Sequence, residues 1–131
     1  MTVNKATVST LKAELTIGLN KGYTKESWLI SEFKDLLVDA QIQLKQEHGL
    51  LLSAKVTECS IVFLAQDEPS VTLSFINYPK FPCTMDAFKT GVQYIAETLM
   101  TTLLQNRIVI VFNDETIMLE GNDAIDGSII I

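Results

Sequence analysis

The chain has 131 residues, of which 47% are hydrophobic and 20% are charged. This composition indicates one compact domain over residues 1–131 and excludes an intrinsically disordered chain. With a formal net charge of −6 and a single arginine, Arg107, the chain lacks the basic patch needed to bind nucleic acid or an anionic membrane surface.

Targeting signals and metal motifs are missing from the sequence. Residues 1–7 have no continuous apolar segment of a signal peptide, and no window approaches the roughly 18 apolar residues of a membrane span. We therefore expect a cytoplasmic protein. Two cysteines are too few for a disulfide scaffold, and the single histidine, His48, excludes two-histidine metal motifs. The acidic residues from Asp114 to Asp126 lack the spacing of a calcium loop, so we expect no metal and no cofactor.

The first half of the chain predicts a strand followed by a helix. Apolar residues alternate with polar ones over Val8–Leu19, which is typical of a half-buried strand. Thr24 is the predicted N-cap of a helix of about twenty residues, and Gly49 is its predicted C-terminal stop. The apolar face of this helix has the spacing i, i+4, i+7, i+11, i+15 and consists of Leu29, Phe33, Leu36, Ala40 and Leu44.

A second β-rich segment covers Leu50–Ala65. Its apolar residues change register in the middle, which predicts a bulge near Glu58–Ser60. Gln66–Pro69 is the predicted hairpin turn, and the chain returns as an antiparallel strand over Val71–Ile76.

A second helix is predicted from Thr84 to about Asn106. Gly91 within it costs about 1 kcal/mol relative to alanine, which indicates a close approach to the sheet. Ile108–Phe112 is apolar on both faces and predicts an inner strand, and Thr116–Leu119 predicts a strand at the edge.

This order, β-α-β-β-α-β-β, matches the α+β class with a ferredoxin-like split βαβ sandwich plus an extra C-terminal edge strand. We expect a mainly antiparallel sheet in the order 2-3-1-4-5, with both helices on one face and strands 1 and 3 as a central parallel pair. Residues 121–131 form a tail that is either flexible or adds a strand. The tunnelling fold of pterin-binding enzymes needs two strands before two consecutive helices, and this chain does not show that order.

Parallel central strands would bring the loops 20–25 and 77–84 together at one end of the sheet, beside two helix N-termini. Backbone N–H groups and lysines there predict a site for an anionic small molecule. The candidate ligand-binding residues are Asn20, Lys21, Tyr23, Asn77, Tyr78, Lys80 and Cys83. The alternative interpretation is that these are ordinary solvated loop residues.

Catalytic motifs are absent. The serine-hydrolase, zinc-protease, dinucleotide and P-loop spacings all fail to match. Cys83 precedes a predicted helix N-terminus that would stabilise a thiolate, but no histidine is near it in sequence, so we predict no catalytic residue. Cys59 lies within the predicted β-rich segment and is expected to be a small core residue.

The uncovered face of the predicted sheet mixes polar residues, such as Thr16 and Ser74, with apolar ones, which favours a homo-oligomer. Two functional hypotheses follow. One is a small interaction or regulatory module without chemistry of its own. The other is a small-molecule anion binder or small enzyme that uses the two loops. A phage- or defence-related inhibitor acting by acidic mimicry is supported by the net charge alone.

Overall fold

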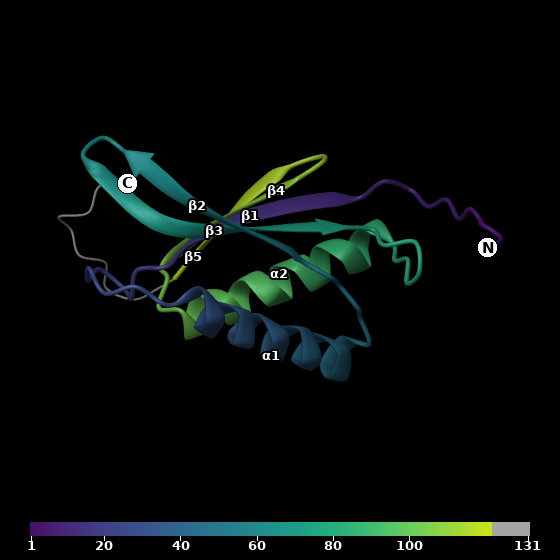
Figure 1. The fold of residues 1–131 in the computed structure, drawn as a ribbon, viewed down its shortest axis with the longest axis horizontal. Coiled ribbons are helices and arrows are strands. Elements are labelled where there is room, and N and C mark those ends of the chain that lie inside the picture. Colours follow the sequence, from purple (N-terminus) through teal and green to yellow (C-terminus); the bar gives the residue numbers. More distant parts are fainter. Residues whose placement is uncertain (122–131) are drawn as a thin grey trace.

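The computed structural model describes residues 1–121, in which two helices cover one face of a five-stranded antiparallel sheet (Figure 1). The sheet order is β2-β3-β1-β4-β5, which confirms the predicted α+β, ferredoxin-like arrangement with an added edge strand. Residues 122–131, most of the predicted tail, lie outside the described part. The elements are β1 (Lys12–Gly18), α1 (Ile30–His48), β2 (Lys55–Phe63), β3 (Gln66–Ile76), α2 (Met85–Thr102), β4 (Arg107–Phe112) and β5 (Thr116–Glu120).

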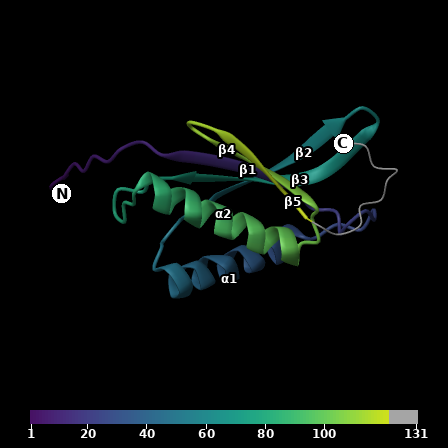
Figure 2. The ribbon, with the colours of Figure 1, turned by 180° about the vertical axis from the view of Figure 1, so that it is seen from behind.

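The hydrophobic core lies between the sheet and the helices, which cover the same face in both views (Figure 2). Successive side chains of a strand point to opposite faces, so alternation decides which residues enter this layer. In β1 the buried set includes Ala13, Leu15 and Ile17, as predicted. The helices contribute Phe33, Leu37, Ala40 and Leu44 from α1 and Phe88, Val92, Ile95 and Leu99 from α2.

The predicted parallel pairing of the two central strands is wrong. β1 pairs antiparallel with β3, and the register places Lys12 opposite Ile76 and Gly18 opposite Ser70. The end of β1 therefore faces the beginning of β3. The physical reason is the split βαβ connection, in which each crossover joins two parallel strands with an antiparallel strand inserted between them.

Helix α1 begins later than predicted. Its N-cap is Leu29, whose backbone N–H donates to the Glu32 carboxylate at 2.9 Å. Thr24 instead closes a turn, because its hydroxyl donates to the Lys21 carbonyl at 2.7 Å. This local hydrogen bond competes with helix capping. The predicted stop at Gly49 is confirmed, since Gly49 has φ 67° in the left-handed region.

The β2–β3 hairpin is longer and more regular than predicted. The pairing runs without interruption from Lys55↔Ser74 to Phe63↔Gln66, so there is no bulge near Glu58–Ser60. The turn is at Leu64–Ala65, with Leu64 at φ 55°, and not at Gln66–Pro69. The apolar side chains change face along β2 without a bulge because the hairpin extends beyond the helix layer, where neither face is covered (Figure 1). Cys59 is exposed there, which corrects its predicted place in the core.

Helix α2 begins as predicted, and the Thr84 hydroxyl accepts a hydrogen bond from the Ala87 N–H at 3.2 Å. Gly91 is buried, but its close neighbour is not the sheet. A Cβ at this position would lie 2.7 Å from the Leu52 Cδ1 and 3.5 Å from the Leu44 Cδ2. The glycine therefore allows close packing against α1 and the segment that follows it. Neither α1 nor α2 is long and apolar enough to cross a membrane.

Candidate functional site

The antiparallel register separates the two loops that the sequence analysis brought together. The loop 20–25 follows the end of β1, and the loop 77–84 follows the end of β3 at the opposite end of the sheet (Figure 1). The structure therefore does not form one site from the seven candidate residues. Whether each loop binds a ligand on its own stays a prediction.

The loop 77–84 is held together by its own hydrogen bonds. The buried Asn77 donates from Nδ2 to the Ser9 carbonyl at 2.9 Å and accepts from the Cys83 N–H at 3.0 Å. Tyr78 stacks on Phe81 with ring centroids 4.8 Å apart. Burial raises the pKa of the Cys83 thiol, which disfavours the thiolate expected there. Lys80, in the same loop, is exposed.

The loop 20–25 contains three of the candidates. Lys21 lies 3.6 Å from the Glu26 carboxylate and 4.7 Å from the centroid of the Trp28 ring, so internal contacts already occupy its ammonium group. Asn20 and Tyr23 line a cavity on the sheet face that the helices leave uncovered.

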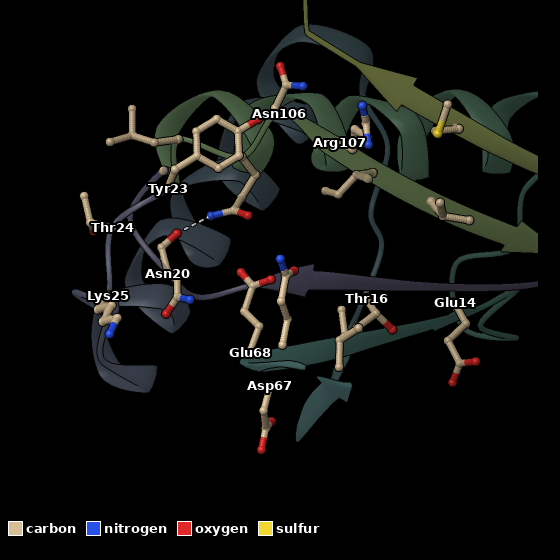
Figure 3. Close-up of a pocket in the computed structure, with 18 of the residues that line it drawn as sticks. Glu14, Thr16, Asn20, Tyr23, Thr24, Lys25, Asp67, Glu68, Asn106 and Arg107 are labelled. Atoms are coloured by element: carbon tan, nitrogen blue, oxygen red, sulfur yellow. Dashed lines mark hydrogen bonds between the residues drawn. The ribbon is translucent and has the colours of Figure 1, made fainter. Parts of the chain in front are cut away.

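This cavity has a volume of about 800 Å³, the size of a small-molecule site (Figure 3). Its floor is the open face of β1 and β4, and its end walls are the loop 20–25 and the segment 104–106 between α2 and β4. The β2–β3 hairpin supplies a side wall through Ile61 and Glu68. The cavity thus collects residues from both halves of the chain.

Glu68 is the half-buried carboxylate of this cavity. It belongs to β3 beside Pro69, and Figure 3 shows it pointing towards the space beside Asn20, with Asp67 directed the other way. Burial raises the pKa of the Glu68 carboxyl, and a hydrogen bond from the Asn20 backbone N–H offsets part of that effect. None of the ion pairs within residues 1–121 involves Glu68.

The other charged residues near the cavity differ from Glu68 in their exposure or in their ion pairing. Glu14 is exposed on β1 and also takes part in no ion pair within the described residues. Arg107, the single arginine, is paired with Glu120 across β4 and β5. The cavity lining holds three carboxylates, Glu14, Asp67 and Glu68, and two cations, Lys25 and the paired Arg107. The excess of carboxylates suits a cation better than the anion that the sequence analysis predicted.

The segment between α2 and β4 is fixed by backbone contacts. Leu104 has φ 60°, an uncommon conformation for a residue with a Cβ. The next residue, Gln105, donates from Nε2 to the Asn20 carbonyl at 2.5 Å and to the Leu103 carbonyl at 3.2 Å. Gln105 thereby ties the loop 20–25 to the end of α2, and Figure 3 shows the bond to Asn20 as a dashed line.

The remaining wall is apolar. Val109 and Met118 lie opposite each other on β4 and β5, and they are 43% and 58% exposed. Ile61 approaches from the hairpin and is also exposed. Apolar walls with a few convergent polar groups are typical of small-molecule and cofactor sites.

Sequence reasoning missed Glu68 and Gln105 because it placed Glu68 in a turn and Gln105 inside a longer helix. One signal was available: Gly18 closes a strand that otherwise alternates cleanly, and a glycine in a strand often marks a close approach. No three His, Cys, Asp or Glu residues within residues 1–121 could together hold a metal ion.

No model of a known protein family matches this sequence, and no curated protein matches it. Solved structures do match by fold. A phage SAM lyase in the apo state superposes with a TM-score of 0.66 at 17% identity, covering 87% of this chain and 91% of that chain. A phage SAM lyase in complex with S-methyl-5'-thioadenosine gives a TM-score of 0.67 at 17% identity, covering 92% of this chain and 97% of that chain. At this identity the likeness establishes the fold alone.

Proposed function

We propose that the protein binds S-adenosylmethionine in the open-face cavity and acts as a small lyase that releases S-methyl-5'-thioadenosine. The observation that carries the proposal is the Glu68 carboxylate, half-buried in a cavity with apolar and amide walls and without an ion-pair partner among residues 1–121. A half-buried carboxylate with a raised pKa in a cavity is a candidate for function. This proposal corresponds to the small-enzyme hypothesis of the sequence analysis, but it places the site in the open-face cavity and not at the two loops 20–25 and 77–84.

The chemistry of S-adenosylmethionine fits the walls of the cavity. Its sulfonium and ammonium groups are cations that complement Glu68 and Glu14, and its adenine ring can pack against Val109, Met118 and Tyr23. The solved SAM lyase with bound S-methyl-5'-thioadenosine has the same fold and supports the choice of ligand.

The reaction class needs no cofactor and no second substrate. The bond between the sulfonium sulfur and Cγ of the methionine part breaks, and its electron pair moves to sulfur, which becomes the neutral thioether. The four-carbon part is completed either by ring closure of its own carboxylate onto Cγ, or by transfer of a Cβ proton to a carboxylate of the cavity, with formation of a Cβ–Cγ double bond. Water is not consumed in either case, so the role of the protein is to hold the substrate in a reactive geometry and to limit the access of water.

The test is to incubate purified protein with S-adenosylmethionine and to follow S-methyl-5'-thioadenosine by liquid chromatography and mass spectrometry. We expect product above the uncatalysed background, and we expect Glu68→Gln to weaken substrate binding roughly tenfold or more, as for a lost charge-assisted contact. Glu58→Gln is the matched control, because Glu58 is an exposed carboxylate of the same hairpin that does not line the cavity. Absence of both binding and product would refute the proposal.

We also propose that the open face is covered by a second copy of the chain, as expected for a homo-oligomer. Exposed apolar side chains on this face support it, in particular Val109, Val111 and Met118. The same exposed apolar surface also supports the interaction-module hypothesis. That hypothesis predicts that copies of the chain associate but do not cleave S-adenosylmethionine.

A further inference from the structure

Gly18, the last residue of β1, lies directly against the Glu68 carboxylate. A Cβ built at position 18 would be 2.1 Å from the Glu68 Oε1, 2.7 Å from its Cδ and 3.1 Å from the Gln105 Oε1. Real Cβ atoms essentially never make contacts below 3.0 Å, so the carboxylate occupies the space that any side chain at position 18 would need.

Backbone conformation does not explain this glycine. Gly22 and Gly49 have φ values of 59° and 67°, where glycine is favoured, but Gly18 is not among the glycines with positive φ. Gly18 also continues the regular pairing of β1, opposite Ser70. Glycine is therefore needed at position 18 because the Glu68 carboxylate approaches the backbone closely, and not because the backbone there adopts a conformation that favours glycine.

The group that a side chain at position 18 would meet is the far end of a flexible side chain. Glu68 can rotate away, so alanine at position 18 is compatible with the fold, but the carboxylate must then leave its place beside the Asn20 N–H. Gly18 thus decides where the half-buried carboxylate of the cavity lies.

We propose that Gly18 is a positioning residue that determines specificity: it seats the Glu68 carboxylate so that the cavity prefers a cationic sulfonium amino acid over the neutral thioether that shares its adenosine. The inference rests on the proposed function, because the two compounds are S-adenosylmethionine and S-methyl-5'-thioadenosine. Both contain the adenosine that the apolar wall would hold, and only the first carries cations for Glu68.

The experiment compares wild type with Gly18→Ala, using Gly91→Ala as the matched control. Gly91 is a buried glycine whose nearest neighbours are leucine side chains away from the cavity. Two quantities are measured: the pH titration of the Glu68 carboxyl carbon by NMR without ligand, and the ratio of the Kd values for the thioether and the sulfonium compound by calorimetry.

For Gly18→Ala we expect the Glu68 titration to move towards the ordinary range and the Kd ratio to fall about tenfold, with the thioether Kd changed less than about twofold. Gly91→Ala should leave both quantities at their wild-type values. Combining Gly18→Ala with Glu68→Asp shortens the acidic side chain by one methylene and should restore part of the ratio. If Gly18→Ala does not fold, Glu68→Asp alone, which retracts the carboxylate from the same place, must lower the ratio.

An unchanged pH titration of the Glu68 carboxyl in Gly18→Ala would overturn the inference. An equal loss of affinity for both compounds would overturn it as well. Wild type that binds both compounds equally would leave the proposed binding site standing and overturn the specificity. Wild type that binds neither compound would refute the proposed function and the specificity together, while the titration would still decide whether Gly18 positions Glu68.

Discussion

Glu68 shows how a single residue gains a functional environment from its neighbours. Pro69 follows it, Gly18 leaves space for its carboxylate, and the Asn20 N–H partly compensates its charge. Burial without a cationic partner in the described residues disfavours the charged form, and this is a cost that the bare protein carries. A cationic ligand would remove that cost.

This environment predicts how stability depends on pH. Because the pKa of Glu68 is raised in the folded state, its favourable contribution is complete below the ordinary value of 4.5 and is lost as the pH rises through the folded pKa. We therefore expect Glu68→Gln to unfold at a higher temperature than wild type at pH 7 and to lose this advantage at pH 4. The difference in unfolding temperature between the two proteins is measured by calorimetry at several pH values, with Asp67→Asn as the control. A wild type that is the more stable protein at pH 7 would contradict the assigned cause.

At the scale of elements, the N-terminus of α2 depends on a side-chain cap. The Thr84 hydroxyl accepts from the Ala87 N–H, so Thr84→Ala should lower the free energy of unfolding by about 1 kcal/mol. Thr101→Ala on the same helix is the control, since that exposed hydroxyl only donates back to the Glu97 carbonyl and should change stability by less than about 0.5 kcal/mol. Denaturant unfolding compares the two, and equal effects would argue against the cap.

The β2–β3 hairpin carries strain at its turn. Leu64 has φ 55° and is 87% exposed, so its side chain gains no packing in return for an unfavourable conformation. We expect Leu64→Gly to raise the free energy of unfolding by about 0.5 to 1 kcal/mol, because glycine is the preferred residue at such positions in two-residue turns. Chemical denaturation tests this prediction. Destabilisation would mean that the Leu64 side chain has a partner that residues 1–121 of one chain do not show.

At the scale of the whole molecule, two helices cover one face of the sheet and leave the other face open (Figure 2). The open face carries the cavity and exposed apolar side chains of β4 and β5, a combination that favours burial against another copy. A site in this position would be enclosed only when the face is covered.

We expect wild type to have a mass in solution that is a multiple of 14.6 kDa, and Val109→Lys to shift it towards the single chain by weakening association about tenfold or more. Val109 lies on the open face, where a lysine would have to be desolvated on association. Val38→Lys is the control, because Val38 is an exposed apolar residue of α1 on the helical side. Light scattering or native mass spectrometry measures the masses, and a monomeric wild type would refute self-association.

The sequence by itself determined the order of the elements, the sheet order and the core faces of β1 and α2, whereas Leu29, predicted on the apolar face of the first helix, is exposed. β1 alternates with period two, and the apolar stripe of α2 recurs at helical spacing, so both patterns are local and can be read from neighbouring residues. The caps at Thr84 and Gly49 were predictable for the same reason, since each depends on only a few adjacent residues.

The tertiary structure alone decided where a ligand could bind. The antiparallel register of β1 and β3 moved the loop 77–84 to the far end of the sheet and brought Glu68 and Gln105 to Gly18. These contacts join residues from about 50 to 90 positions apart, and no local period encodes which of them meet. Strand pairing is a non-local property, so the residues of the cavity became visible only once the chain was folded.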